Sequence, residues 1–332
     1  MVKEVLRATI VLLALSMIIS QGFASVGTIF LKSHPRNIPS IVSTNWLKGN
    51  LHRKNLVVLD VRKPELYSAG HIPEAINVPE GEWYVNDPFT VPFSTPWMEL
   101  PSEEELFELV GDAGITSDSR VVVVGSTSGS LNPMTPLALY GVAGTDRVAI
   151  TLLYAGVRNV AILDGGYEKW VADGYSTESG TVTPTPVTYM GEVDETTFVS
   201  IEYVKNRIGE SVIVDARDPE VYCGDVHEPW NTQDGHIPTA KNLPAPELFN
   251  IKEDGAGNAV YITYKKMGTL KEMVSNAVGN NKNKEIIVYC GVGGYSSAAY
   301  FVLSETLGYI NVKIYDGSAQ EWTWQKKTVE KC

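Results

Sequence analysis

Cysteine is scarce in this chain, and its scarcity excludes two kinds of architecture. Cys223, Cys290 and Cys332 are the only cysteines in 332 residues, an odd number without CxxC spacing. Neither a disulfide framework nor a zinc ribbon is therefore indicated. The five histidines are scattered and no HExxH motif occurs, so we expect no metal and no other cofactor.

Long basic runs are missing as well. The net charge is −12 at neutral pH, and no run of Lys or Arg is longer than a pair such as Lys265-Lys266. Binding to nucleic acid requires clustered positive charge that neutralises phosphates, so we expect no nucleic acid partner. With 44% apolar and 20% charged residues, the composition is typical of globular proteins, and the length suits two domains.

The N-terminal residues have the pattern of an export signal. Lys3 and Arg7 precede the apolar stretch 8–19, and small residues follow as far as Ala24. This order predicts a signal peptide over residues 1–24 and an exported protein, periplasmic or extracellular.

An uncleaved N-terminal anchor is the alternative. No charge occurs from Ala8 to Leu31, and this length could cross a bilayer, although polar residues interrupt it at Ser20 and Gln21. In that case the protein would be anchored in the membrane and would face outward.

The chain repeats itself. The segment "LVVLDVRKPELYSAGHIPEAINVP", residues 56–79, returns as residues 212–222 and 235–244, with a ten-residue insertion in the second copy. Further on, "VAILDGGYEKW", residues 160–170, matches "VKIYDGSAQEW", residues 312–322. Repetition on this scale indicates two homologous domains.

Each copy alternates strands and helices. Short apolar runs are typical of strands buried on both faces of a parallel sheet; they cover residues 57–59, 121–124, 212–214 and 285–289. Helical patterns lie between them, and the first begins with Ser102 and Glu105 in capping-box spacing. We therefore predict an α/β fold, with a mainly parallel sheet flanked by helices in each domain.

The domain boundaries follow from composition. Residues 176–193 are rich in Ser, Thr, Gly and Pro and lack apolar periodicity. We place one domain at residues 38–178, a linker at 179–197 and a second domain at 198–328.

Cys290 ends an apolar run and begins a glycine-rich turn. The predicted cradle around its sulfur consists of Gly291, Val292, Gly293, Gly294, Tyr295 and Ser296. Backbone N–H groups of such a turn can converge on the sulfur, and the helix that follows presents its positive end. This arrangement stabilises an anion, as a thiol that carries or attacks another group requires.

These motifs together resemble the rhodanese sulfurtransferases. The resemblance rests on Asp-x-Arg after a strand, "GHIP", the cysteine loop, and "DG" followed by Trp, and it runs from about residue 38 to 325. The tandem arrangement is similar to the thiosulfate and 3-mercaptopyruvate sulfurtransferases. The resemblance implies that Cys290 takes a sulfane sulfur from thiosulfate or a related small donor as a persulfide. It then passes the sulfur to a thiol or cyanide acceptor.

The first domain lacks the cysteine. Alignment of its strand with that of the second copy places Ser126 opposite Cys290, with no neighbouring base in the sequence. We expect this domain to be non-catalytic and to wall the site.

Two sets of polar residues recur in both copies. Asp215, Arg217 and His236 look like an acid–base set, but their counterparts Asp60, Arg62 and His71 occur in the domain without a cysteine. We expect both sets to stabilise the fold through buried hydrogen bonds.

The other cysteines have no evident chemistry. We expect Cys223 to pack in the insertion, with a resolving thiol as the alternative, and Cys332 to be mobile and incidental at the chain end.

Two positions bear on the donor. The mercaptopyruvate enzymes of the family hold the substrate carboxylate with two arginines, and the matching residues here are Val221 and Trp230. Thiosulfate enzymes often carry a basic residue where Val292 stands. We therefore expect both donors to be held weakly, and thiosulfate to be used better than 3-mercaptopyruvate.

The sequence bears on four other functions. The loop "CGVGGYSS" has no cation to clamp a phosphate, which disfavours a phosphatase of the same fold. An exported sulfane-sulfur binding or delivery protein with little turnover alone remains open, as does a 3-mercaptopyruvate sulfurtransferase. The cysteine loop argues against a purely structural role, and the sequence does not indicate an oligomeric state.

Overall fold

The computed structural model describes residues 36–85, 98–132 and 136–332. The predicted leader lies outside these ranges. Within them, no helix is both long enough and apolar enough to cross a membrane.

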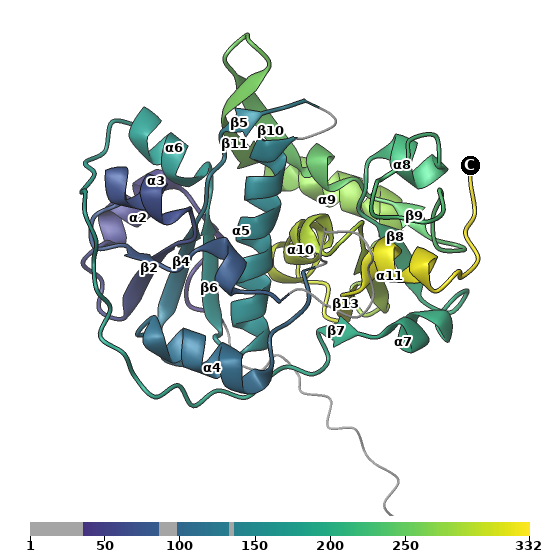
Figure 1. The fold of residues 1–332 in the computed structure, drawn as a ribbon, viewed down its shortest axis with the longest axis horizontal. Helices are drawn as coiled ribbons and strands as arrows, with labels where there is room; N and C mark the ends of the chain where they lie inside the picture. The colour runs from purple at the N-terminus through teal and green to yellow at the C-terminus, as the bar shows by residue number, and fades with distance from the viewer. Residues whose placement is uncertain (1–35, 86–97, 133–135) are drawn as a thin grey trace, which may run out of the picture. The chain divides into compact units, whose positions relative to one another are not determined.

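The first sheet has five parallel strands in the order β1-β6-β4-β2-β3 (Figure 1). Their bounds are β1 Ile41–Val42, β2 Leu56–Asp60, β3 Ile76–Asn77, β4 Arg120–Val124 and β6 Asn159–Leu163. The second sheet repeats this order as β7-β13-β12-β8-β9, again all parallel. Its strands are β7 Phe198–Val199, β8 Val212–Asp215, β9 Lys241–Asn242, β12 Ile286–Tyr289 and β13 Val312–Tyr315. The predicted pair of α/β domains with parallel sheets is confirmed.

Helices flank both sheets. In the first half they are α2 Thr44–Asn50, α3 Pro64–Ala69, η1 Glu80–Glu82, α4 Glu103–Asp112, α5 Leu137–Tyr154 and α6 Gly166–Ala172. In the second half they are α7 Ile201–Lys205, α8 Pro219–Cys223, η2 Ala245–Leu248, α9 Met267–Val278, α10 Gly294–Tyr300, the π-helix η3 Phe301–Thr306 and α11 Ser318–Trp324. The expected capping box at Ser102 and Glu105 starts α4, and Gly279 ends α9 with a positive φ.

Alternate residues of each central strand enter different cores, as the two-residue period of a strand requires. In β4, Val122 and Val124 join the core under α2, α3 and α6, whereas Val121 and Val123 join the core under α4 and α5. This second core continues across α9 and α10 into the other sheet. Helices α5 and α10 pack against each other and join the two domains.

A hairpin also joins the domains. Strands β10 Phe249–Glu253 and β11 Asn258–Tyr264 are antiparallel, and β11 pairs with β5 Gly129–Ser130 of the first domain. The Tyr264 hydroxyl donates to the buried Asp146 carboxylate in α5. Burial raises the pKa of Asp146 to about 8.

Cys223 and Cys332 form a disulfide, which corrects two expectations. Cys223 was expected to pack as a thiol and Cys332 to be mobile, yet the bond joins the end of α8 to the last residue, 109 positions away. Backbone bonds between Glu330 and His236 in both directions hold the C-terminal segment in place.

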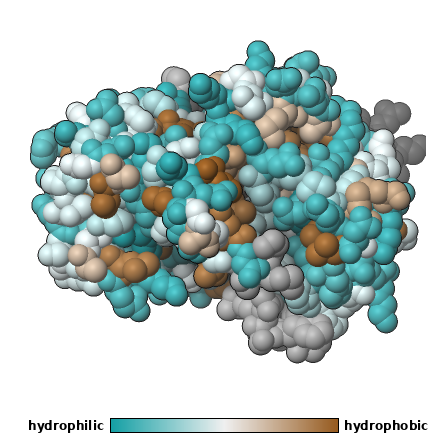
Figure 2. Space-filling view, turned by 90° about the horizontal axis from the view of Figure 1, so that it is seen from above, coloured by the Kyte–Doolittle hydropathy of each residue, from teal (hydrophilic) through white to brown (hydrophobic). Residues whose placement is uncertain are grey.

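The face shown in Figure 2 is mostly hydrophilic, with hydrophobic side chains in small groups.

Candidate functional site

Cys290 lies directly after β12, at the carboxyl end of the second sheet. The register pairs Tyr289 with Asp215 of β8, so the cysteine sits where two central strands end. The Cys290 residue is 2% exposed, and it is a free thiol.

Two residues of the predicted cradle contact the sulfur. The Gly293 N–H donates to Cys290 Sγ at 3.1 Å, and the Ser296 hydroxyl lies 3.6 Å from Sγ. Gly293 has φ 104°, which a residue with a side chain rarely adopts, so the turn needs glycine there. Among the described residues, these are the two polar groups bonded to the sulfur.

The other cradle residues serve neighbouring elements. The Gly291 carbonyl accepts a hydrogen bond from Gln320, and the Val292 carbonyl accepts one from the Met98 N–H at 3.2 Å. Gly294 faces Ala143 of α5. Half-buried Tyr295 faces Tyr140 instead of the sulfur.

Ser318 binds the backbone of Cys290. The sequence alone did not identify it as a site residue. Its hydroxyl accepts a hydrogen bond from the Cys290 N–H at 3.3 Å, and its φ is 53°. The Cys290 carbonyl accepts from the Ala319 N–H at 2.9 Å. Ser318 belongs to the "DGS" motif, and this motif is the sequence signal that could have identified it.

The first domain reaches the loop through α5. Arg147 is fully buried, and its Nη1 lies 2.6 Å from Asp316 Oδ1. The same nitrogen is next to the loop, since it would lie 3.4 Å from a Cβ added at Gly293. Burial, then the charge of Asp316, raises the pKa of nearby Glu99. Residues of α5 come from the other domain, so no local pattern around Cys290 could have identified them.

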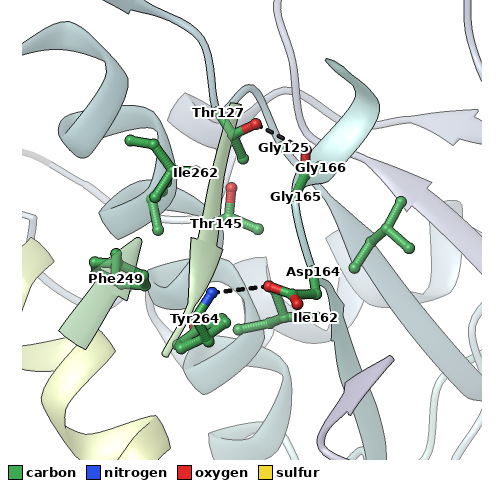
Figure 3. Close-up of a pocket in the computed structure, with 12 residues that line it drawn as sticks. Gly125, Thr127, Thr145, Ile162, Asp164, Gly165, Gly166, Phe249, Ile262 and Tyr264 are labelled. Atoms are coloured by element: carbon green, nitrogen blue, oxygen red, sulfur yellow. Dashed lines mark hydrogen bonds between the residues drawn. The ribbon is translucent and has the colours of Figure 1, made fainter. Parts of the chain in front are cut away.

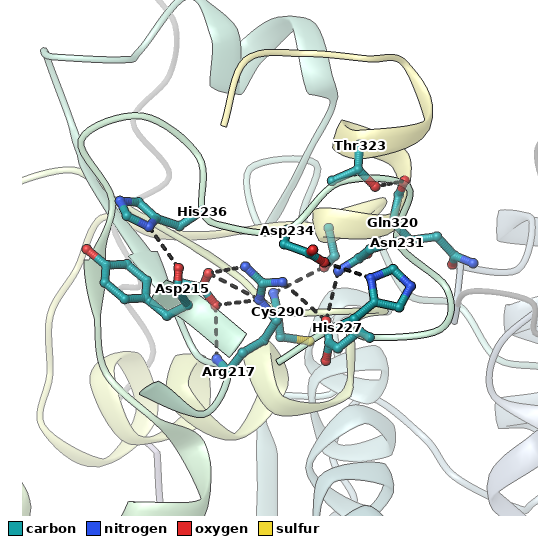
Figure 4. Close-up of polar contacts among 12 residues, drawn as sticks. Asp215, Arg217, His227, Asn231, Asp234, His236, Cys290, Gln320 and Thr323 are labelled. Atoms are coloured by element: carbon teal, nitrogen blue, oxygen red, sulfur yellow. Dashed lines mark hydrogen bonds and ion pairs between the residues drawn. The ribbon is translucent and has the colours of Figure 1, made fainter. Parts of the chain in front are cut away.

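Asp215, Arg217 and His236 make hydrogen bonds that hold the backbone and one another in place (Figure 4). Arg217 Nε and Nη2 donate to the Asp215 carboxylate, and Nη2 also donates to the Gly235 carbonyl. His236 Nδ1 lies 2.9 Å from the Tyr222 carbonyl.

The same bonds occur in the first domain. Arg62 binds the Asp60 carboxylate and the Gly70 carbonyl, and His71 Nδ1 lies 3.0 Å from the Tyr67 carbonyl. The expectation that both sets make buried hydrogen bonds is confirmed.

The insertion of the second domain lies against the cysteine loop. A Cβ at Gly291 would be 2.6 Å from the Trp230 indole nitrogen and 3.1 Å from a Glu228 carboxylate oxygen. The Trp230 nitrogen is buried and has no hydrogen-bond partner within the described ranges. Burial raises the pKa of Glu228, and the Arg217 guanidinium opposes this shift. Position 230 therefore reaches the loop, as the alignment with the family's arginine implied.

The first domain's counterpart of Cys290 is Gly125, not Ser126. Val124 pairs with Asp60 as Tyr289 pairs with Asp215, so the residue after each strand is equivalent. Because β4 contains four consecutive valines, the sequence alone does not fix the alignment of the two strands, and the predicted alignment was wrong by one residue. A Cβ at Gly125 would collide with the Thr145 hydroxyl, so this position admits no nucleophile without rearrangement.

A carboxylate occupies the first domain's loop. Glu168 accepts hydrogen bonds from the hydroxyls of Ser126, Thr127 and Ser128 and from the Thr127 N–H at 2.8 Å. The expectation that Ser126 has no neighbouring base is thus wrong, since the Glu168 carboxylate accepts a hydrogen bond from its hydroxyl at 2.7 Å. Gln320 stands at the matching position of the second domain. The cysteine loop therefore has a neutral side chain where the first domain's loop has a carboxylate.

The second domain's hairpin also closes the first domain's loop (Figure 3). Phe249, Ile262 and Tyr264 line a small cavity with Gly125 and Thr127 of the loop. The space open to the centre of a water molecule is about 10 Å³, enough for about one water. Within the described residues, no group of three or more His, Cys, Asp or Glu side chains is placed to hold a metal ion.

The chain matches known proteins along most of its length. Residues 43–173 and 200–324 each match the family described as Rhodanese-like domain. The chain is 31% identical over 297 residues to "Putative thiosulfate sulfurtransferase" of Synechococcus elongatus, with 87% of this chain and 84% of the relative covered. It is equally identical, over 297 residues, to "Sulfur carrier protein TtuD" of Thermus thermophilus, with 85% and 93% covered.

Solved structures share the fold. SseA of Escherichia coli, a 3-mercaptopyruvate sulfurtransferase by its title, matches with a TM-score of 0.65 and 25% identity, covering 85% of this chain and 99% of that one. An anaerobic ergothioneine biosynthesis enzyme of Chlorobium limicola matches with a TM-score of 0.72 and 23% identity, covering 88% and 70%. At that identity the second match shows the fold alone.

Proposed function

Because the chain belongs to the rhodanese family and is a sulfurtransferase of that kind, we propose that it carries sulfane sulfur as a persulfide on Cys290. The observation that carries the proposal is the Gly293 N–H directed at Cys290 Sγ, at the positive end of α10. The second loop has a sulfur where the first has Gly125, and it lacks the carboxylate that fills the first. The N-terminal domain is then a non-catalytic partner.

The proposed donor half-reaction is a displacement at sulfur. The Cys290 thiolate attacks the outer sulfur of thiosulfate, the sulfur–sulfur bond of the donor breaks, and sulfite leaves with the electron pair. The Gly293 N–H and the positive end of α10 stabilise the anionic persulfide that remains. An assay of thiosulfate with cyanide tests this, since the native protein should release sulfite and thiocyanate in equal amounts.

A delivery protein with little turnover alone is the second candidate, and the name of the Thermus thermophilus relative favours it. The persulfide would form equally well, but cyanide or small thiols would discharge it slowly. Discharge that speeds up only when a cell extract is added would support delivery to a specific acceptor.

We expect thiosulfate to be used better than 3-mercaptopyruvate. Neither Val221 nor Trp230 can bind a carboxylate as arginine does, and Arg217 is committed to Asp215 and Glu228. A tenfold or greater preference in kcat/KM for mercaptopyruvate would contradict this.

The variant Trp230→Arg tests the same donor preference, because it should improve the use of 3-mercaptopyruvate. Because position 230 reaches the loop at Gly291, the new guanidinium should bind the donor carboxylate. We expect kcat/KM for 3-mercaptopyruvate to rise about tenfold, since a charge-assisted bond contributes roughly 1.5 kcal/mol or more. Trp230→Leu is the control, and it should give no such gain.

We also propose that the protein is exported. The basic, apolar and small-residue order of residues 1–24 supports this, and so does the disulfide, a bond that persists in oxidising compartments. N-terminal sequencing of the mature protein should begin at Ser25. Membrane-bound protein that begins at Met1 would indicate the anchor instead.

A further inference from the structure

The side chains around Cys290 carry more negative than positive charge. Arg217 pairs with the carboxylates of Asp215 and Glu228, and half-buried Asp218 follows it in the chain. Three carboxylates and one guanidinium leave two net negative charges when all are ionised. A small anion near the cysteine therefore gains nothing from Arg217.

Two basic side chains of the described residues are already bound. Arg147 is fully buried and paired with Asp316, and Lys265 donates to the Glu247 carbonyl. The internal segments 86–97 and 133–135, outside the described ranges, contain no Lys or Arg in the sequence. The cysteine loop contains none either.

Two aromatic rings lie at the cysteine loop. Tyr140 of α5 and Tyr295 of α10 meet across the domain boundary with ring centroids 6.1 Å apart, and Tyr140 is 40% exposed. Burial, then the carboxylates of Glu228 and Asp218, raises the pKa of Tyr140. Tyr295 belongs to the cysteine loop and Tyr140 contacts its ring, so both rings lie at the same end of α10 as Cys290.

We infer that the sulfur acceptor is a thiol that carries a positive charge, such as an ammonium group, within a few bonds of its sulfur. This inference rests on the proposed persulfide at Cys290. Exposed aromatic faces attract cations, and nearby carboxylates add to the attraction. The cation would lie beside Tyr140 and Asp218 while its sulfur reaches the persulfide.

The transfer step balances without a further reactant. The acceptor thiol gives its proton to the anionic Cys290 persulfide. Its thiolate then attacks the outer sulfur, and a new sulfur–sulfur bond forms. The bond between that sulfur and Sγ breaks, and its electron pair stays on Sγ as the thiolate. The acceptor leaves as a protonated persulfide, so no net oxidation takes place.

Single-turnover transfer from persulfide-loaded protein tests the inference. Cysteamine, 2-mercaptoethanol and 3-mercaptopropionate offer a cationic, a neutral and an anionic acceptor of similar size. With rates normalised to thiolate concentration, cysteamine should react at least about tenfold faster than 3-mercaptopropionate at low ionic strength. Added salt should shrink the ratio.

Variants distinguish this effect from general damage. Tyr140→Leu and Asp218→Asn should each reduce the ratio severalfold, whereas Tyr140→Phe keeps the ring and should preserve it. Glu272→Gln, an exposed acid on α9, is the matched control and should leave the ratio unchanged.

The outcomes separate the two proposals. Absence of a persulfide before acceptor is added would overturn the proposed function and this inference with it. A persulfide that passes to 3-mercaptopropionate as fast as to cysteamine at low salt would overturn this inference alone.

Discussion

Cys290→Ser should abolish sulfur transfer, lowering kcat/KM for thiosulfate by at least about 10³-fold, as removal of a nucleophile does in other enzymes. A serine hydroxyl is a far weaker nucleophile than a thiolate, and the loop N–H at Gly293 does not supply a base to activate it. The variant should still fold, because Ser318 binds the backbone N–H at position 290 and not the sulfur. Thiocyanate production from thiosulfate and cyanide gives the measurement.

Ser126→Ala is the matched control in the first domain. It removes one bond to Glu168, but the Thr127 N–H and two other hydroxyls still bind that carboxylate. Activity should stay within about twofold of the native protein, because Ser126 lies in the loop of the first domain and is not the equivalent of Cys290. A fully active Cys290→Ser protein would end the persulfide account.

The double variant Cys223→Ser/Cys332→Ser should lose much of the second domain's stability. The disulfide closes a loop with a sequence separation of 109, and a cross-link of that span lowers the entropy of the unfolded chain. The chain-entropy relation gives about 4.8 kcal/mol at this length. Urea unfolding followed by tryptophan fluorescence should show the transition of this domain at lower denaturant.

Reduction of the native protein is the control. Dithiothreitol should move the native transition to that of the double variant and leave the variant unchanged. If variant and native protein unfold at the same urea concentration, the bond contributes nothing. The variant should still form the persulfide, because the groups bonded to Cys290 Sγ are those of Gly293 and Ser296, in its own loop.

The cysteine loop could be predicted because its signals are local. A strand, a cysteine, closely spaced glycines and a helix follow one another within residues 286–300, and glycine is needed where φ is positive at Gly293. The fold could be predicted for a similar reason, because each repeated strand is a short apolar run. The buried bonds of Arg62 and Arg217 also followed from recurrence in both copies.

Features that depend on distant parts of the chain could not be predicted. Cys223 and Cys332 are far apart in sequence, and no local pattern pairs them. Tyr140 and Arg147 approach the loop from the other domain, through the packing of α5 on α10. The equivalence of Gly125 with Cys290 required the sheet register, because a run of valines matches itself at more than one offset.

Intact-mass analysis after treatment with thiosulfate tests the central claim most directly. The native protein should gain the mass of one sulfur atom, and cyanide or dithiothreitol should remove it. Peptide mapping should place the added sulfur on Cys290, while Cys290→Ser gains nothing. A native protein that gains no sulfur, or gains it equally without Cys290, would contradict the account.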